Sequence, residues 1–134
     1  MDHRTDDRAS PVRSRRRDDA FSTQILDRAL ARKRAEREHL RQAVYARTIA
    51  ALERLADDVA FERAILFGSV LATGRFRADS DVDIAFSGLD DTDFFPVVAR
   101  LSRELERDVD IIQLENHPLA TSVLEKGVVW RPKR

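Results

Sequence analysis

The sequence predicts an α/β (α+β) fold, in which a small mixed β-sheet is flanked by helices and preceded by a long N-terminal helix. Residues 21–56 contain no Gly and no Pro and are rich in helix-forming residues. After residue 57 the pattern changes to short apolar runs that alternate with amphipathic stretches. At 134 residues the chain is long enough for one domain with its own core, but not for two.

Composition excludes several classes of protein. The chain contains no cysteine, which excludes disulfides, thiolate metal sites and a cysteine nucleophile. No run of apolar residues is long enough to span a membrane, and the polar N-terminus lacks the apolar core of a secretory signal. We therefore expect a cytoplasmic protein without a membrane partner.

The formal net charge is zero, but the charges are segregated along the chain. Residues 1–56 carry a net charge of +5, residues 57–95 carry −6, and residues 96–134 carry +1. Like charges repel unless something neutralises them. The acidic segment therefore requires an explanation, and a bound cation would supply one.

The N-terminal third divides into two predicted segments. Residues 1–20 hold few apolar groups and are predicted to form a disordered tail. Residues 21–56 are predicted to form one long helix, whose second half carries an apolar stripe at Leu40, Val44 and Leu55. The stripe of the first half is interrupted at Lys33. The helix therefore either breaks near Lys33 or continues as an arm that meets a partner or a second copy.

The remaining residues, 57–134, are predicted to form the sheet domain. Gly68 ends the first strand, and Gly74 and Gly127 end two later helices. Phe95, Val98, Leu101 and Leu105 are expected to face inward from the helix that contains them. In chain order we predict a strand at 64–67, a short helix at 69–73, a strand at 81–86, a helix from about 92 to 107, a strand at 109–114, a helix from about 118 to 126 and an extended piece at 128–130.

Three aspartates stand inside these apolar strands, where charges are costly. Asp81 and Asp83 lie two residues apart on one strand, so both side chains leave the same face, with Cβ atoms within roughly 7 Å of each other. Asp110 lies on the next strand and reaches the same cluster if the two strands are neighbours. Carboxylates this close repel unless a cation lies between them, and oxygen ligands suit Mg²⁺ or Mn²⁺.

Gly68 and Ser69 follow the end of the preceding strand and open the short helix. A glycine there allows backbone N–H groups to approach an anion closely, and the Ser69 hydroxyl can donate as well. Phosphates bound at this point would lie beside a cation held by Asp81 and Asp83. Together these residues would then form two halves of a nucleoside triphosphate site. Alternatively, the acidic pair is an exposed strand face, or belongs to a glycosyltransferase or an aspartyl phosphatase.

The motifs resemble the minimal nucleotidyltransferases of the DNA polymerase β-like superfamily. The resemblance rests on Leu66-Phe67-Gly68-Ser69, Gly74, Asp79-Ser80-Asp81-Val82-Asp83-Ile84 and Val109-Asp110-Ile111-Ile112, with further similarity around the last helix. It covers about residues 57–130, slightly over half of the chain.

The resemblance implies an enzyme that transfers a nucleoside monophosphate, AMP from ATP, to a hydroxyl group on an acceptor. Three carboxylates and two Mg²⁺ ions, with Mn²⁺ as a possible substitute, would carry out the transfer. By motif position, Asp81 and Asp83 would hold both ions, and Asp110 would bind the ion that activates the acceptor. Gly68 and Ser69 would hold the β- and γ-phosphates.

The resemblance also implies a partner. Related minimal nucleotidyltransferases act as antitoxins of HEPN-domain toxins, and this core is too short for a separate acceptor-binding domain. The acceptor is therefore expected to be macromolecular, and the N-terminal helix is a candidate surface for a partner or for a second copy.

The sequence departs from the family pattern in one place. Ser69 and Gly74 are separated by one residue more than usual, and Thr73 stands where Arg is common. This departure leaves open a second function, in which an inactive or weakly active antitoxin neutralises its partner only by forming a complex.

Overall fold

The computed structural model describes the backbone of residues 3–133 and the side chains of residues 22–133. The first helix, α1 (His3–Asp58), is continuous. It contains the helix predicted at 21–56 and does not break at Lys33, so that alternative is wrong.

The structure differs from the sequence prediction over residues 3–20, which belong to α1 rather than to a separate tail. Arg, the most frequent residue in this stretch, is a good helix former. Adding a residue to an existing helix is also much easier than starting a new helix. A helix established over 21–58 can therefore extend into a segment with no apolar face of its own.

The chain divides into two compact units, residues 1–36 and 37–134. The first unit consists of the N-terminal part of α1. The second contains the rest of α1 together with the sheet and all the other helices.

A four-stranded mixed sheet forms the centre of the second unit, as predicted. Its strand order is β3-β2-β1-β4. The pair β2–β3 is parallel, whereas β1 pairs with β2 and with β4 in antiparallel fashion. The strands are β1 (Arg63–Phe67), β2 (Val82–Ser87), β3 (Val109–Gln113) and β4 (Val128–Trp130), close to the predicted bounds.

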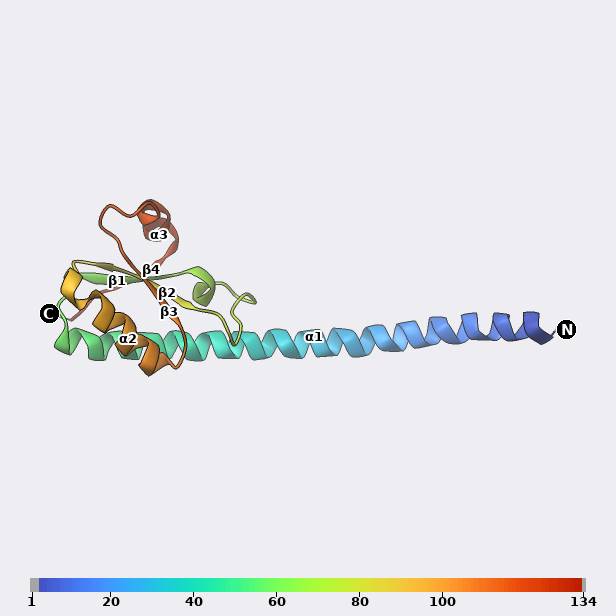
Figure 1. Ribbon diagram of the computed structural model, residues 1–134. Helices are drawn as coiled ribbons and strands as arrows, with labels where there is room; N and C mark the ends of the chain where they lie inside the picture. Colours follow the sequence, from blue (N-terminus) through green and yellow to red (C-terminus); the bar gives the residue numbers. More distant parts are fainter. Residues whose placement is uncertain (1–2, 134) are drawn as a thin grey trace. The chain divides into compact units, whose positions relative to one another are not determined.

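Helices cover both faces of this sheet. Figure 1 shows α2 and the C-terminal part of α1 on one face and α3 on the other. The helices after α1 all lie in the connections between successive strands. Their bounds are η1 (Gly68–Leu71), η2 (Asp91–Asp93), α2 (Phe94–Leu105) and α3 (Ala120–Lys126).

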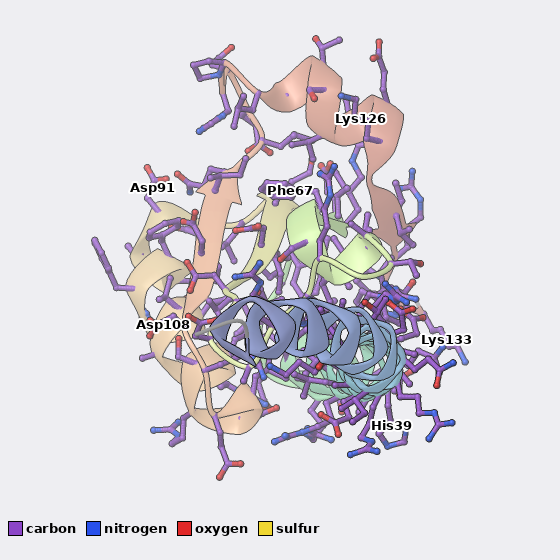
Figure 2. All side chains as sticks on the ribbon, turned by 90° about the vertical axis from the view of Figure 1, so that its right-hand side faces the viewer. His39, Phe67, Asp91, Asp108, Lys126 and Lys133 are labelled. Carbon is purple, nitrogen blue, oxygen red and sulfur yellow. The ribbon has the colours of Figure 1, made fainter. Side chains whose placement is uncertain are left out.

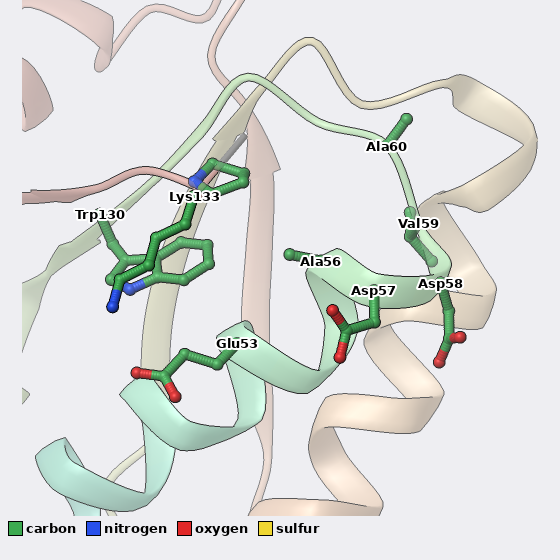
Figure 3. Close-up of a pocket in the computed structure, with 9 residues that line it drawn as sticks. Glu53, Ala56, Asp57, Asp58, Val59, Ala60, Trp130 and Lys133 are labelled. Carbon is green, nitrogen blue, oxygen red and sulfur yellow. The ribbon is translucent and has the colours of Figure 1, made fainter.

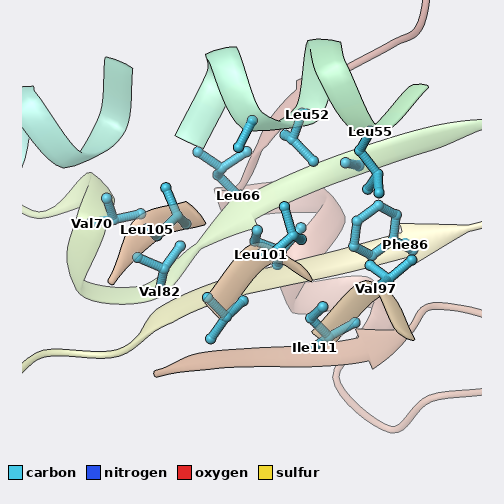
Figure 4. Packing of buried hydrophobic residues seen from close by; sticks show 14 of the residues in the cluster. Leu52, Leu55, Leu66, Val70, Val82, Phe86, Val97, Leu101, Leu105 and Ile111 are labelled. Atoms are coloured by element: carbon cyan, nitrogen blue, oxygen red, sulfur yellow. The ribbon is translucent and has the colours of Figure 1, made fainter. Parts of the chain in front are cut away.

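Two apolar clusters hold these layers together. The larger one lies between the sheet and the helices α1 and α2, and includes Leu52, Leu66, Phe86 and Leu101 (Figure 4). Leu52 is fully buried, like Leu55 one turn further along α1. The smaller cluster joins the other sheet face to α3 through Ile65, Ala85, Leu114 and Val123. The second half of α1 is thus part of the domain core.

One prediction of an inward-facing residue was wrong. Phe95 is 77% exposed, whereas Val97, Leu101 and Leu105 are the buried residues of α2. These three residues recur every four positions and share one face, and Phe95 falls outside that face because successive residues are rotated by about 100° around a helix. Val98 is half-buried against the larger cluster.

Within residues 3–133, no helix is both long and apolar enough to cross a membrane. The cytoplasmic location stays a prediction.

We expect Leu52→Ala to lower the free energy of unfolding by about 3 kcal/mol, because it opens a cavity in the core. Leu26→Ala is the control, since Leu26 lies on the same helix with a 57% exposed side chain and should change stability little. Urea unfolding followed by circular dichroism measures both. Equal losses in the two variants would contradict this packing of α1.

Candidate active site

The three predicted aspartates lie near the start of the neighbouring strands β2 and β3. Asp83 and Asp110 are directly opposite each other in the parallel pair β2–β3, and Asp81 immediately precedes β2. Their neighbours Val82 and Ile84 are fully buried in the cluster beneath α1 and α2. Because side chains alternate along a strand, the aspartates leave the opposite face, which carries α3. The condition that the strands carrying Asp83 and Asp110 are neighbours is confirmed.

Gly68 lies against the Asp83 carboxylate. Phe67 is opposite Asp83 in the β1–β2 pair, and Gly68 follows it with a φ of +79°. A Cβ atom at position 68 would overlap the Oδ2 atom of Asp83. Both the positive φ and the close approach therefore require glycine at this position.

The position of Asp83 raises the pKa of its carboxyl group from 3.8 to about 6. Partial burial is the main cause, because removal from water disfavours the charged form. The negative charges of Asp110 and Asp81 raise the pKa further. The negative charges of Asp81, Asp83 and Asp110 are therefore not balanced by positively charged groups around them in the part of the chain that the structure describes.

This surplus of charge and the chemistry of the donors fit a divalent cation. Three carboxylates are the oxygen donors that Mg²⁺ and Mn²⁺ prefer. As they stand, no three His, Asp or Glu side chains of the described part of the chain are gathered tightly enough to hold an ion. Asp81 and Asp110 are exposed, so their side chains have room to change rotamer, whereas Asp83 is partly buried and lies beside Gly68. The residues present therefore fit a metal that joins the three carboxylates on binding.

Ser69 lies in η1, immediately after Gly68 and next to the aspartates. The 3₁₀ turn is closed by a 3.0 Å hydrogen bond from the Ala72 N–H to the Ser69 carbonyl. Gly74 lies in a separate turn, where the Arg75 N–H donates to the Ala72 carbonyl. The unusual spacing between Ser69 and Gly74 therefore leaves the contact of Gly68 with Asp83 intact.

Sequence reasoning missed Arg107, which supports the loop that leads to Asp81. Its Nη1 donates a 2.8 Å hydrogen bond to the Ser80 carbonyl, and its guanidinium lies 4.8 Å from the centre of the Phe76 ring. Burial is the main cause that lowers the pKa of Arg107, and repulsion from the positive charge of Arg47 lowers it further. No signal in the sequence separates Arg107 from the other charged residues around it.

The view in Figure 2 places Phe67 on the side of the sheet that carries α3 and its last residue, Lys126. Phe67 packs against the smaller apolar cluster, which joins β1 to α3. The strand end that carries Gly68 is thus anchored on the same face as the aspartates.

A pocket of about 690 Å³ lies at the other end of the sheet (Figure 3). Trp130 in its wall is opposite Ala64 in the sheet, whereas Asp83 is opposite Phe67. The pocket is therefore separate from the aspartate cluster. Its lining residues are Glu53, Ala56, Asp57, Asp58, Val59, Ala60, Trp130, Pro132 and Lys133.

Comparison with protein families decides the identity of the domain. The family model described as "Polymerase beta, Nucleotidyltransferase" matches residues 51–130, more than half of the chain. The chain belongs to this nucleotidyltransferase family. The match covers every strand of the sheet and all three aspartates.

Solved structures share the nucleotidyltransferase fold. A structure described as a minimal nucleotidyltransferase is 29% identical, with a TM-score of 0.51, and the alignment covers 66% of this chain and 93% of that one. A toxin–antitoxin structure with AMP-PNP is 24% identical, with a TM-score of 0.53 over 64% of this chain and 74% of that one. The toxin–antitoxin MntA–HepT is 21% identical, with a TM-score of 0.50 over 66% of this chain and 73% of that one. No curated protein matches the chain.

Replacing Gly68 by Ala should destabilise the nucleotidyltransferase domain by at least about 1 kcal/mol more than replacing Gly74 by Ala. Both glycines have a positive φ, which costs an alanine about 1 kcal/mol, but an added Cβ has no neighbour within 4 Å at Gly74. Chemical denaturation measures the difference. In the double variant Gly68→Ala/Asp83→Ala the excess should disappear, and equal losses in the two single variants would contradict the contact.

Asp83→Asn should stabilise the metal-free protein at pH 7 by about 1 kcal/mol, because solvent screening reduces the full electrostatic effect of a partly exposed group. The folded pKa of about 6 lies above the unfolded value, so Asp83 costs stability as pH rises from about 4 to about 6. The advantage of the variant should therefore vanish near pH 4 and be constant above pH 7. Thermal unfolding of the variant and the wild type between pH 4 and pH 7 tests this expectation. A difference in stability that stays the same at every pH would refute it.

Proposed function

We propose that the protein is a Mg²⁺-dependent nucleotidyltransferase that transfers AMP from ATP to a hydroxyl group of a macromolecular acceptor. The observation that carries the proposal is the Asp83 carboxylate, which lies against Gly68 and opposite Asp110. This contact brings the metal-binding and phosphate-binding halves of a nucleotide site together. Membership of the family supports the same reaction class.

In this proposal the residues divide between metal binding and phosphate binding. Asp81 and Asp83 would hold both metal ions, with Asp110 as a further ligand of one of them. The backbone N–H groups and hydroxyl of Gly68 and Ser69 would hold the β- and γ-phosphates. Mg²⁺, when bound, supplies the positive charge that stabilises both the attacking and the leaving oxygen of an in-line displacement. The surplus negative charge around Asp83 then becomes a binding determinant.

Asp110 would bind the ion that activates the acceptor oxygen and would take the proton from the acceptor's hydroxyl group. The acceptor oxygen forms a bond to the α-phosphorus as the bond from that phosphorus to the bridging oxygen breaks. Pyrophosphate leaves with the electron pair. Asp110 is suited to this role because it is exposed at the open edge of the cluster, opposite the partly buried Asp83.

We further propose that the acceptor is a HEPN-type toxin, and that the protein acts as its antitoxin. The toxin–antitoxin structures among the neighbours, one of them with AMP-PNP, support a toxin partner and a nucleotide. Within the N-terminal unit, Ile25, Leu26 and Leu30 are between 44% and 57% exposed. Such a row of exposed apolar residues supports contact with the toxin or with a second copy.

The test uses the purified protein with ATP, MgCl₂ and the purified product of the adjacent gene. Intact mass spectrometry should show that the partner gains one or more AMP units with the wild type and none with Asp81→Asn. The matched control is Asp79→Asn, which changes an exposed aspartate of the same loop outside the metal set and should leave the transfer unchanged. A partner that gains no mass, or gains it equally with Asp81→Asn, would contradict the enzymatic proposal.

The alternative function is an antitoxin that acts only by forming a complex. It is favoured by the open arrangement of the carboxylates, which do not form a closed metal site within the described residues. The double variant Asp81→Asn/Asp83→Asn distinguishes the two functions in cells that express the toxin. Loss of neutralisation supports chemistry, and unchanged neutralisation supports complex formation.

A further inference from the structure

Arg41 of α1 contacts the turn that carries Gly68 and Ser69. Its Nη1 donates a 3.1 Å hydrogen bond to the Val70 carbonyl in η1, across 29 positions of the chain. The Arg41 side chain is only 17% exposed. This contact therefore joins the helix to the candidate phosphate-binding turn.

The contact satisfies a carbonyl at the end of a short helix. The last carbonyls of any helix lack partners within it, and η1 is only four residues long. The Ser69 carbonyl accepts from the Ala72 N–H, and the Val70 carbonyl accepts from Arg41. The Val70 side chain is fully buried in the larger cluster, so η1 is held by both its backbone and its side chain.

Glu38 fixes the orientation of Arg41. Its two carboxylate oxygens accept hydrogen bonds of 2.8 Å and 2.6 Å from Nε and Nη2 of Arg41, which leaves Nη1 for the Val70 carbonyl. Gln42 donates a further 2.9 Å hydrogen bond to Glu38. These bonds lower the pKa of Glu38 to about 2, and the bond from Arg41 contributes most. The Glu38 carboxylate therefore remains charged. A bidentate guanidinium–carboxylate pair restricts both side chains to one geometry.

We propose that Arg41, oriented by Glu38, is a positioning residue that holds η1 in the conformation that binds phosphate. The proposal rests on the proposed function, in which Gly68 and Ser69 hold the β- and γ-phosphates. Gly68 packs against the Asp83 carboxylate with no room for a side chain, and the hydrogen bond from Arg41 holds η1 at Val70. Ser69 lies between these two restraints.

The pair lies outside the region that the family model matches, which begins at residue 51. Glu38 and Arg41 lie on the part of α1 that precedes the matched residues. The first helix contributes to the candidate active site as well as to the core.

The experiment compares Arg41→Gln with Arg47→Gln in the full chain. Arg47 is a matched control because it also donates from α1 to a backbone carbonyl, that of Glu104 at 2.9 Å, but contacts α2 rather than η1. Hydrogen–deuterium exchange measures the opening of residues 68–72, and calorimetry with ATP and MgCl₂ measures nucleotide binding.

Arg41→Gln should speed exchange over residues 68–72 several-fold and weaken ATP binding about tenfold, as expected for the loss of a charged hydrogen bond. Arg47→Gln should leave both quantities unchanged. Arg41→Lys should recover part of the loss, because lysine can still donate to Val70 but cannot form the fork with Glu38. Glu38→Gln, which keeps the donors of Arg41, should give a smaller effect in the same direction.

Wild-type exchange and affinity in Arg41→Gln would overturn the positioning role. The same conclusion would follow if Arg47→Gln changed both quantities as much. If Arg41→Gln does not fold, Arg41→Lys and Glu38→Gln test the positioning role instead, through exchange over residues 68–72 and the affinity for ATP. If the wild type binds no ATP while exchange at 68–72 still depends on Arg41, the proposed function fails and the positioning of η1 by Arg41 is confirmed.

Discussion

The contact between the Asp83 carboxylate and the backbone of Gly68 is the constraint on which the candidate site depends. It places a carboxylate beside a backbone turn with no side chain between them, which only glycine allows. It also partly buries that carboxylate near two others, so the metal-free protein bears an electrostatic cost at neutral pH. A protein retains such a cost where it serves a function, and a divalent cation would remove it.

The sheet and α1 together make this contact possible. The antiparallel β1–β2 pair sets Phe67 opposite Asp83, and the parallel β2–β3 pair sets Asp110 on its other side. The second half of α1 covers the opposite face of the sheet and, through Arg41, reaches η1. The positively charged segment of the chain therefore supports the acidic site, in addition to any role in binding a partner.

Local patterns predicted much of this arrangement. The end of β1 at Gly68 and the pairing of Asp81 with Asp83 on one face follow from local patterns along the chain. The position of Asp110 beside them also required the parallel pairing of β2 with β3, which the sequence does not show. The contacts of Arg41 and Arg107 could not be predicted, because a surface arginine and one that reaches a distant carbonyl look alike in sequence. Phe95 was misplaced because steps of three residues drift around a helix of about 3.6 residues per turn, so that Phe95 lies off the face that is buried. Residues 3–20 were predicted to be a disordered tail because they contain too few apolar residues to form a core. That composition does not prevent a segment from prolonging a helix that has already formed next to it.

The most direct test of the account is an NMR titration of the Asp83 carboxyl group in the metal-free protein and in the presence of MgCl₂ and ATP. The account predicts a pKa of about 6 without metal and a value well below that when the ion and nucleotide are bound, since a nearby cation favours the charged form. A pKa near the ordinary value of 3.8 without metal, or one that MgCl₂ and ATP do not change, would contradict it.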